Sequence, residues 1–217
     1  MKALRQLLLH PNRINVLSAA APTATKNQYL VLRHGHSVGN LKQVIASDPQ
    51  TAIEQFGLTE RGHQEVSETI SSQRDRLKEV AQIYASDFLR TRQTAELVAD
   101  ELTLPLTLSP KLRERYFGDW EGTSTKNYPR VWEADANDSD HQMHQVESVQ
   151  QVAKRMLNFV AQQEHSHSGM TILLVSHGDP LQILLTAMQG KPLTNHRSGS
   201  PMRTAELRQF DSRTLTL

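Results

Sequence analysis

The sequence contains no cysteine among its 217 residues. Disulfide bonds, thiolate nucleophiles and cysteine metal sites are therefore excluded, although the cellular compartment is not, because exported and cytosolic proteins can both lack cysteine. Long hydrophobic runs are missing as well, and none approaches the roughly 18 apolar residues that a membrane-spanning helix needs. The sequence therefore predicts neither a disulfide-stapled protein nor a membrane protein.

An excess of charge of either sign is also absent. Lys and Arg number 24 against 23 Asp and Glu, which gives a net charge of +1. This balance provides no general field for holding nucleic acid or an anionic membrane, so we expect neither as a partner. With 37% hydrophobic and 22% charged residues, the chain has the composition of one globular domain. Any anion binding must come from a local cluster of side chains.

Acidic residues are missing from the beginning of the chain, where the first is Asp48. The apolar Leu7–Leu9 is followed by polar residues at 10–13, which is too short for a secretory signal. The segment is either a flexible or loosely docked extension or, being basic and acid-free, an organelle transit peptide. We predict an extension over residues 1–27, a domain over 28–217 and a cytoplasmic protein, with organelle targeting as the alternative.

Short apolar runs alternate with helical patterns along the rest of the chain. We expect strands at residues 29–33, 82–86, 106–109, 171–175 and 204–210, and helices at 59–80, 88–102, 148–163 and 178–188. Thr59 and Asp87 are the expected N-caps of the first two helices. The alternation predicts a three-layer α/β/α sandwich with a mostly parallel central sheet. The polar residues 123–147 predict a short cap insertion, in the form of a hydrated loop over the domain.

Two histidines follow expected strands, in Arg33-His34-Gly35 and Ser176-His177-Gly178. In parallel sheets, ligands bind beyond the carboxyl ends of the strands, where loops and helix N-termini converge. A glycine after His34 would let the backbone turn sharply and bring its N–H groups close to an anion. The two histidines are therefore expected to meet in space.

Three further residues strengthen this interpretation, because a single histidine at a strand end is usually structural. Arg90 lies in the first turn of an expected helix, where the guanidinium and the free backbone N–H groups both favour negative charge. Glu114 lies in a glycine-punctuated loop after a strand, where catalytic residues are commonly placed. Asn40 follows His34 in the same loop. Together they point to an anion-handling site.

Five ordered blocks resemble the histidine phosphatase, or phosphoglycerate mutase-like, superfamily. They are Leu32-Arg-His-Gly-His-Ser-Val-Gly-Asn40, Leu58-Thr-Glu-Arg-Gly62, Ala85-Ser-Asp-Phe-Leu-Arg-Thr-Arg-Gln-Thr-Ala95, Leu112-Arg-Glu-Arg-Tyr-Phe-Gly-Asp-Trp-Glu-Gly122 and Val175-Ser-His-Gly178. An Arg-His-Gly triplet alone is a weak signal, whereas five blocks in family order are a specific one. The resemblance implies the phosphoglycerate mutase-like fold.

The resemblance also implies roles for individual residues. His34 is implied as the nucleophile and Glu114 as the proton donor to the leaving oxygen, with phosphate contacts from Arg33, Asn40, Arg90 and His177. A phosphoryl group in a loose transition state keeps its charge on the equatorial oxygens, so two guanidiniums and an imidazolium at His177 would suffice without a metal or cofactor. His34 must attack as a neutral imidazole, whose tautomer we expect a backbone carbonyl to fix.

Three residues are candidates for substrate specificity. His36 stands where many relatives carry a carboxylate or an amide, so its role is open. Lys126 and Arg130 in the expected insertion are positioned to hold a second acidic group of the substrate, or are solvated surface charges.

Several functions compete for this sequence. The prediction is a phosphomonoester hydrolase that acts on a small phosphorylated metabolite through a phosphohistidine. A phosphoglycerate mutase would return the same phosphoryl group to a second substrate hydroxyl, and a phosphoprotein phosphatase would use a more open cleft. A metal-dependent hydrolase could use His34-x-His36, but Arg33 and Arg90 would repel a cation. A noncatalytic phospholigand-binding relative is disfavoured because the catalytic set is complete. The sequence leaves the substrate and the oligomeric state open.

Overall fold

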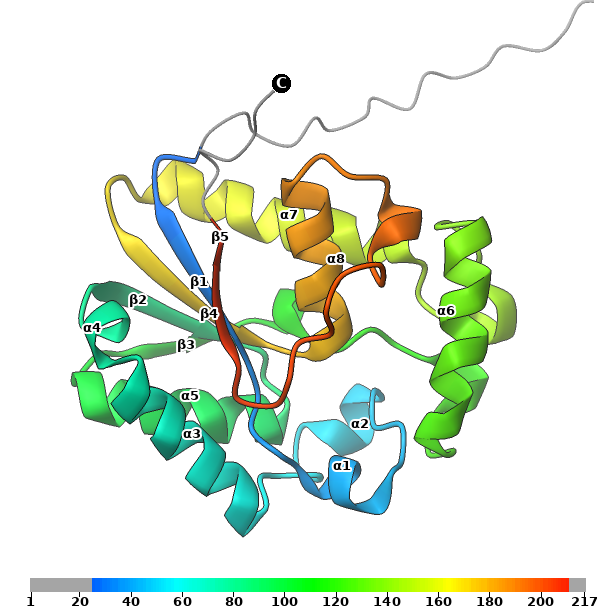
Figure 1. The fold of residues 1–217 in the computed structure, drawn as a ribbon, viewed down its shortest axis with the longest axis horizontal. Helices are drawn as coiled ribbons and strands as arrows, with labels where there is room; N and C mark the ends of the chain where they lie inside the picture. Colours follow the sequence, from blue (N-terminus) through cyan, green and yellow to red (C-terminus); the bar gives the residue numbers. More distant parts are fainter. Residues whose placement is uncertain (1–24, 211–217) are drawn as a thin grey trace, which may run out of the picture.

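The computed structural model describes residues 25–210 and is built around a five-stranded sheet with the strand order β3-β2-β4-β1-β5 (Figure 1). The elements are β1 Gln28–Arg33, α1 Val38–Lys42, α2 Pro49–Ala52, α3 Glu60–Ser72, α4 Arg74–Leu77, β2 Val80–Ala85, α5 Leu89–Leu102, β3 Leu106–Leu108, α6 Tyr128–Asn137, α7 Val149–Ser166, β4 Thr171–Ser176, α8 Gly178–Met188 and β5 Leu207–Phe210. Within residues 25–210, no helix is both long and apolar enough to cross a membrane.

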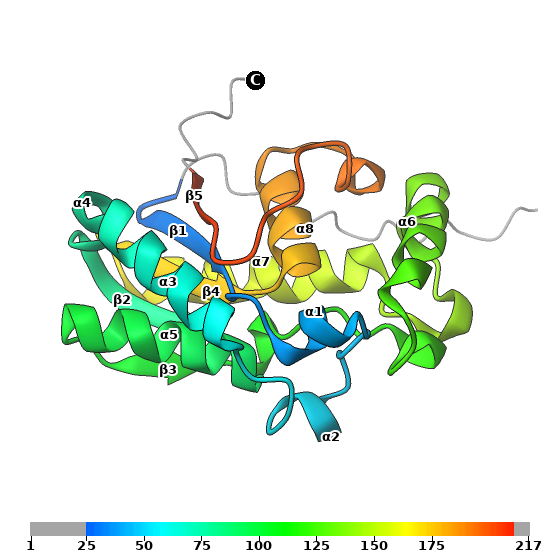
Figure 2. The ribbon, with the colours of Figure 1, turned by 60° about the horizontal axis from the view of Figure 1, so that its bottom comes forward.

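The sheet is mostly parallel, as the sequence predicts. Strands β1 to β4 pair in parallel, and only β5 runs antiparallel, against β1. Helices α3 and α5 cover one face of the sheet and α7 and α8 the other (Figures 1 and 2). The predicted three-layer α/β/α sandwich is therefore confirmed.

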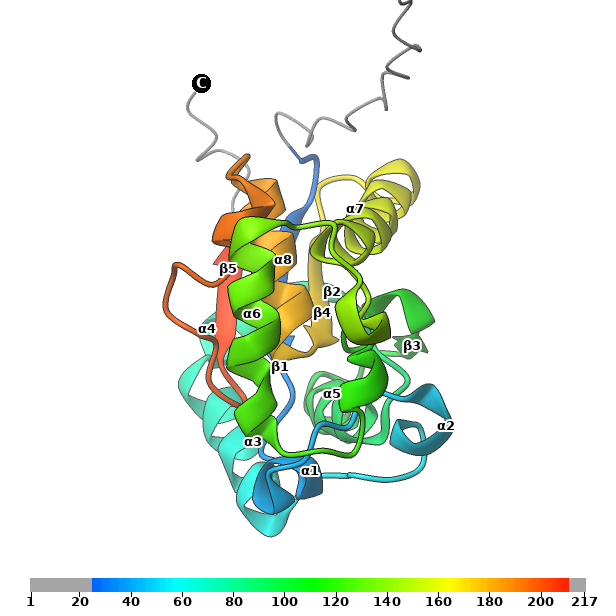
Figure 3. The ribbon, with the colours of Figure 1, turned by 90° about the vertical axis from the view of Figure 1, so that its right-hand side faces the viewer.

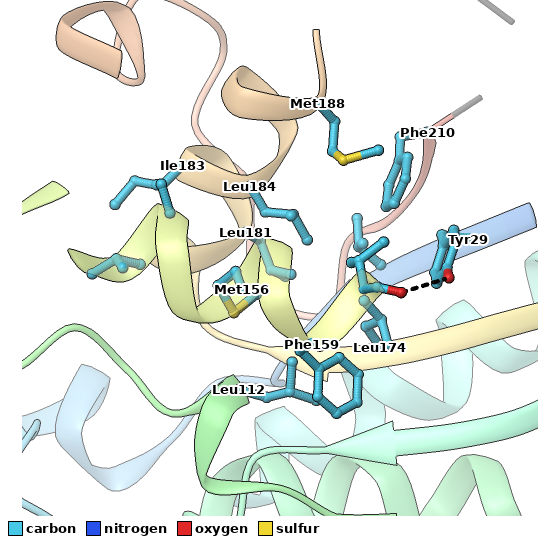
Figure 4. Packing of buried hydrophobic residues seen from close by; sticks show 14 of the residues in the cluster. Tyr29, Leu112, Met156, Phe159, Leu174, Leu181, Ile183, Leu184, Met188 and Phe210 are labelled. Carbon is cyan, nitrogen blue, oxygen red and sulfur yellow. Dashed lines mark hydrogen bonds between the residues drawn. The ribbon is translucent and has the colours of Figure 1, made fainter. Parts of the chain in front are cut away.

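Alternating side chains of the central strands fill the two cores. In β1, Tyr29 and Val31 face α7 and α8, whereas Leu30 and Leu32 face the α5 side. Figure 4 shows the first of these cores, where Met156 packs with residues of α8. Each fully buried aliphatic side chain contributes roughly 1.5–3 kcal/mol. These cores fix β1 and β4 side by side, and the site depends on that pairing.

The beginning of the described chain is tied to α7. The backbone N–H of Lys26 and the Asn27 side chain both donate to the Glu164 carboxylate, and Asn27 also donates to the carbonyl of His167. The predicted extension therefore joins the domain slightly before residue 28. Residues 1–24, on which the targeting hypothesis depends, lie outside the described residues.

Two helix predictions are wrong. Asp87 does not cap α5, because its carboxylate binds both Arg113 nitrogens Nε and Nη2, at 2.8 and 2.6 Å, and Phe88 takes the cap position without a side-chain bond. The helix that Thr59 caps ends at Ser72 instead of reaching Val80. Val80 is the first residue of β2, where it is buried and pairs with Thr171 of β4, so the helix must end before it.

The insertion contains a helix, which the sequence analysis missed. Instead of a hydrated loop over 123–147, α6 stands apart from the sandwich, beyond α8 (Figure 1), and lies in front of α8 in Figure 3. Val131 packs into a small separate core with Ile45, Phe117 and Val146. This third core stabilises a helix whose short, polar sequence gave little helical signal.

Helix α3 approaches the loop after β1 so closely that Gly62 cannot carry a side chain. A Cβ atom on Gly62 would lie 2.0 Å from the carbonyl oxygen of His36, and one on Gly35 would lie 2.6 Å from the carbonyl oxygen of Gly62. The two glycines face each other and let Thr59 bind His36, through its backbone N–H and its hydroxyl. The Leu58–Gly62 block of the sequence is thus explained by packing.

We predict that Gly62→Ala destabilises the protein, although Gly to Ala within a helix normally stabilises by about 1 kcal/mol. The new methyl group must displace two backbone segments, which we expect to cost about 3 kcal/mol or more and to lower the melting temperature by roughly 6–12 °C. Gly199→Ala is the control, because a Cβ there meets nothing within 4 Å. Equal melting temperatures for the two variants would contradict the packing account.

Candidate active site

The register between β1 and β4 brings the two predicted histidines together. Arg33 lies opposite Ser176, so the residues that follow, His34 and His177, leave the sheet at the same point. The His34 N–H donates to the Ser176 carbonyl at 3.0 Å, and the two imidazole rings meet edge to face with centroids 5.3 Å apart. The expectation that the histidines meet in space is confirmed.

The His34 ring is held in one tautomer. Its Nδ1 lies 2.8 Å from the carbonyl oxygen of Gly35, which can only accept, so Nδ1 carries the proton. Nε2 therefore presents its lone pair and accepts from Nε of Arg90 at 3.3 Å. Burial, and then the charges of Arg90 and Arg33, hold the pKa of His34 well below its usual value. The ring is thus neutral, and its unprotonated Nε2 faces Arg90.

Two buried guanidiniums flank this lone pair. Arg90, in the first turn of α5, donates from Nη2 to the carbonyl of Ala46 at 3.0 Å. Arg33, at the end of β1, donates from Nη1 to the carbonyl of Met202 at 2.6 Å and packs on Gly178, where a Cβ would lie 3.4 Å from its Cζ. Backbone carbonyls therefore hold both cations without neutralising them.

Ser86 orients the second histidine. The Phe88 N–H donates to the Ser86 hydroxyl oxygen at 3.3 Å, which leaves the hydroxyl to donate to Nε2 of His177, 3.0 Å away. The proton of His177 is then on Nδ1. Burial, followed by Arg90, holds the pKa of His177 well below its usual value, which favours a neutral ring over the expected imidazolium. Sequence reasoning missed Ser86, although it stands at the carboxyl end of β2 within one of the family blocks.

Three buried N–H donors of this cluster have no hydrogen-bond partner. They are Nε of Arg33, Nη1 of Arg90 and Nδ1 of His177, and they make up half of the six buried side-chain polar atoms without a partner in the described part of the chain. Leaving such a donor unsatisfied costs about 1–3 kcal/mol. These donors belong to residues that adjoin His34, and they are available to an oxyanion.

Glu114 lies beside His177. Its Oε1 accepts from the backbone N–H of Arg115 at 2.9 Å, and its Oε2 is 4.0 Å from Nδ1 of His177. Burial raises the pKa of Glu114 to about 7, against the lowering effect of Arg90. A carboxyl with this pKa can donate a proton and take one back near neutral pH.

The other predicted residues are placed differently. Asn40 lines a cavity of about 280 Å³ together with Arg33 and Glu114. Its amide oxygen accepts from Ser37 in the capping box of α1, which leaves the amide nitrogen for a ligand. His36 does not line this cavity, because its Nδ1 binds the Thr59 hydroxyl and its ring faces a groove along α3.

Lys126 and Arg130 are exposed and do not line the cavity either; the Arg130 guanidinium lies over the Trp120 ring. Their expected place is taken by Arg197, which sequence reasoning missed. Arg197 lies 3.8 Å above the Trp132 ring and lines the cavity with it. No motif marks Arg197, because only the tertiary fold brings the loop after α8 to α6.

The side chains of His34 and His36 are not arranged as the metal-dependent hydrolase alternative requires. His34 and His36 turn their Nδ1 atoms to different partners, the Gly35 carbonyl and the Thr59 hydroxyl. Over residues 25–210, no group of three or more His, Asp or Glu side chains is arranged to hold a metal ion.

Comparisons with known proteins agree with this geometry. The family model of the histidine phosphatase superfamily (branch 1) matches residues 29–213. A probable phosphoglycerate mutase, GpmB, of Erwinia tasmaniensis is 30% identical over 175 residues, which are 78% of each chain. The uncharacterized phosphatase PhoE of Bacillus subtilis is 26% identical over 164 residues, 74% of this chain and 76% of PhoE.

Solved structures show the same fold. A mycobacterial glucosyl-3-phosphoglycerate phosphatase in complex with VO3 superposes with a TM-score of 0.72 at 24% identity, covering 84% of this chain and 91% of its own. YhfR of Bacillus stearothermophilus superposes with a TM-score of 0.70 at 27% identity, covering 84% and 90%. The chain thus belongs to the histidine phosphatase superfamily, branch 1, a family of metal-independent phosphoryl-transfer enzymes.

Proposed function

We propose that this protein hydrolyses phosphomonoesters of small metabolites through a phosphohistidine on His34. The observation that carries the proposal is the set of three unpartnered N–H donors on residues that adjoin His34, namely Arg33, Arg90 and His177, together with the unprotonated Nε2 of His34. Two of these donors belong to guanidiniums, which suit phosphate oxygens in geometry and charge. The arrangement matches the needs of a phosphoryl group better than those of a neutral ligand.

In the first half-reaction, Nε2 of His34 forms a bond to phosphorus as the bond to the leaving oxygen breaks. The guanidiniums of Arg33 and Arg90 and Nδ1–H of His177 stabilise the charge on the equatorial oxygens. Glu114 gives its proton to the leaving oxygen, so the product leaves as an alcohol. Asn40 offers its amide nitrogen as a further phosphate contact.

In the second half-reaction, water replaces the alcohol. The Glu114 carboxylate takes one proton from the water as its oxygen bonds to phosphorus, and the bond between phosphorus and Nε2 breaks. Inorganic phosphate leaves, and both His34 and Glu114 return to their starting protonation states. One carboxyl thus serves both steps.

The surroundings of Glu114 favour hydrolysis over transfer to a second substrate. Besides the 280 Å³ cavity, Glu114 lines a second groove of about 600 Å³, bounded by polar residues of α2, α7 and the 142–147 segment. Water can reach the carboxyl from this side even when a leaving group fills the cavity. A mutase must keep water away from its phosphohistidine.

The size of the cavity favours a small substrate. Its 280 Å³ lie between the catalytic loops and Tyr128 and Trp132 of α6, which suits a metabolite better than a folded phosphoprotein. Because relatives are named for phosphoglycerate and glucosyl-3-phosphoglycerate, phosphorylated carboxylates belong in the first substrate panel. We also propose a cytoplasmic location, on the sequence grounds given above.

Arg90→Ala is expected to weaken the binding of phosphate and vanadate by about 10- to 100-fold, the equivalent of one or two charge-assisted hydrogen bonds. Isothermal titration calorimetry without added metal measures this. Arg92→Ala is the matched control, because Arg92 lies on the same helix but pairs with Glu96 at the surface. Equal vanadate affinity in Arg90→Ala and the wild type would rule out the proposed pocket.

The pKa of Glu114 predicts the pH dependence. Because Glu114 must be protonated to donate, kcat/KM for an alkyl phosphate should fall as the pH rises through about 7. Glu114→Gln should abolish this limb and slow alkyl phosphates by about 100-fold or more, but p-nitrophenyl phosphate far less, because its leaving oxygen needs little protonation. Equal losses on both substrates would show that Glu114 is not the donor.

The test of the proposed function compares hydrolysis with isomerisation in one reaction. The wild type is incubated with 3-phosphoglycerate and a catalytic amount of 2,3-bisphosphoglycerate, and a broad phosphometabolite panel is assayed in parallel. We expect phosphate release with little isomerisation. Rapid quench should leave an acid-labile label on His34, and His34→Ala should show no turnover. Fast isomerisation with negligible phosphate release would replace the hydrolase by a mutase, and full activity of His34→Ala would remove the nucleophile.

A further inference from the structure

A buried ion pair joins helix α6 to the loop that carries Glu114. Arg115 and Asp135 both have 0% of their side chains exposed. Nη1 and Nη2 of Arg115 bind the two carboxylate oxygens of Asp135 at 2.7 and 2.8 Å, as parallel hydrogen bonds. Bidentate pairing of this kind fixes orientation as well as distance. Because Asp135 belongs to the insertion and Arg115 to the catalytic loop, the pair couples the two.

Other charged and titratable groups surround the pair. Asp179, at the start of α8, lies 3.3 Å from Nη1 of Arg115, and His141 lies 2.7 Å from Asp135. His196 is 3.7 and 3.8 Å from the two carboxylates, and Arg197 is 3.3 Å from Asp179. Burial lowers the pKa of His196, so its ring adds no charge. Two guanidiniums therefore face two carboxylates, with the His141 ring against Asp135.

Arg115 also fixes Glu114 through the backbone. Its N–H donates to Oε1 of Glu114 at 2.9 Å, while its Nε donates to the carbonyl of Glu147 at 2.6 Å. The guanidinium is thus anchored at three nitrogens, so the peptide that holds Glu114 cannot rotate without breaking buried bonds. The other oxygen of Glu114 remains beside His177.

We infer that Asp135 of α6 is a positioning residue, which acts through Arg115 to hold the Glu114 carboxyl where it can deliver its proton. The inference rests on the proposed hydrolase function, in which Glu114 is the donor. Asp135 touches no reacting atom in this account. Its effect is on the direction and the protonation of Glu114.

The pair also controls the charge that Glu114 experiences. Glu114 faces Arg33 from β1, Arg90 from α5, and His177 and Asp179 from the β4–α8 junction, and it also interacts with Tyr128 of α6. Arg155 donates from Nη2 to the Glu114 carbonyl at 3.2 Å, and Arg115, the next residue in the chain, is paired with Asp135. Without Asp135, the unbalanced guanidinium of Arg115 would stabilise the Glu114 carboxylate and lower the pKa of Glu114. Without both Asp135 and Arg115, Asp179 would lose a counter-charge, and its negative charge would raise the pKa of Glu114.

A purely structural role can be distinguished because α6 offers a matched control. Val131 lies one turn before Asp135 on α6, is buried and packs into the small core with Phe117. Val131→Ala removes apolar packing of the helix but leaves both carboxylates and Arg115 in place. A loss of stability alone would therefore affect Val131→Ala and Asp135→Asn in the same way.

The test measures the alkyl-to-aryl phosphate rate ratio at pH 5.5 and the pH profile of kcat/KM on an alkyl phosphate. In Asp135→Asn we expect the ratio to fall about tenfold, part of the effect of general acid catalysis, and the basic limb to move to lower pH. In Arg115→Met combined with Asp135→Leu, the ratio should fall as well, but the limb should move to higher pH. Val131→Ala should keep the wild-type ratio and limb.

The double variant also protects the test against misfolding, because apolar replacement of a whole buried ion pair is often tolerated when removal of one partner is not. An unchanged ratio in the folded variants, or equal changes in Val131→Ala, would overturn the positioning role. The ¹³C titration of the Glu114 carboxyl, followed by NMR in the same proteins, reads the coupling without turnover. If the wild type hydrolysed no phosphomonoester, the proposed function would fail. Opposite shifts of the Glu114 titration in Asp135→Asn and in the double variant would still establish the coupling. Equal titrations in all these proteins would refute it.

Discussion

The repulsion between two buried guanidiniums, Arg33 and Arg90, is the constraint on which the rest of the site depends. Within residues 25–210, neither forms an ion pair with a carboxylate; each is held by a backbone carbonyl instead. Burying uncompensated charge is unfavourable, so the surrounding fold must be rigid enough to enforce it. A dianionic phosphoryl group relieves the repulsion. The cost of burying the two cations and the proposed affinity of the site for an anion therefore have the same cause.

This constraint also sets the protonation of the two histidines. The charges of Arg90 and Arg33 add to burial in lowering the pKa of His34, and Arg90 does the same to His177. A neutral His34 keeps the lone pair that attack on phosphorus requires. The same cations oppose the effect of burial on Glu114, which brings its pKa to about 7 instead of higher. The proposed nucleophile and the proposed proton donor are thus tuned by one pair of guanidiniums.

Much of this could be predicted from the sequence, because it depends on local pattern. Buried parallel strands are short apolar runs, and residues that follow them meet at one edge of the sheet, which placed His34 beside His177. What failed depends on tertiary partners. Asp87 has the residue type of an N-cap but binds Arg113, and the insertion folds into α6 because Val131 finds a core that no local pattern reveals. Arg197 reaches Trp132 across 65 residues of chain, and the neutral state of His177 follows from the degree of burial.

The insertion therefore has a larger part than its polar sequence suggested. Through Tyr128 and Trp132 it closes one side of the cavity, and through Asp135 it reaches the loop of the proton donor. The open groove on the other side of Glu114 remains outside this cover. A cap that covers the cavity yet leaves the carboxyl open to the groove fits the proposed hydrolase, in which the alcohol would depart into the cavity and water would enter from the groove. Hydrolysis then needs no large opening of α6 between the two steps.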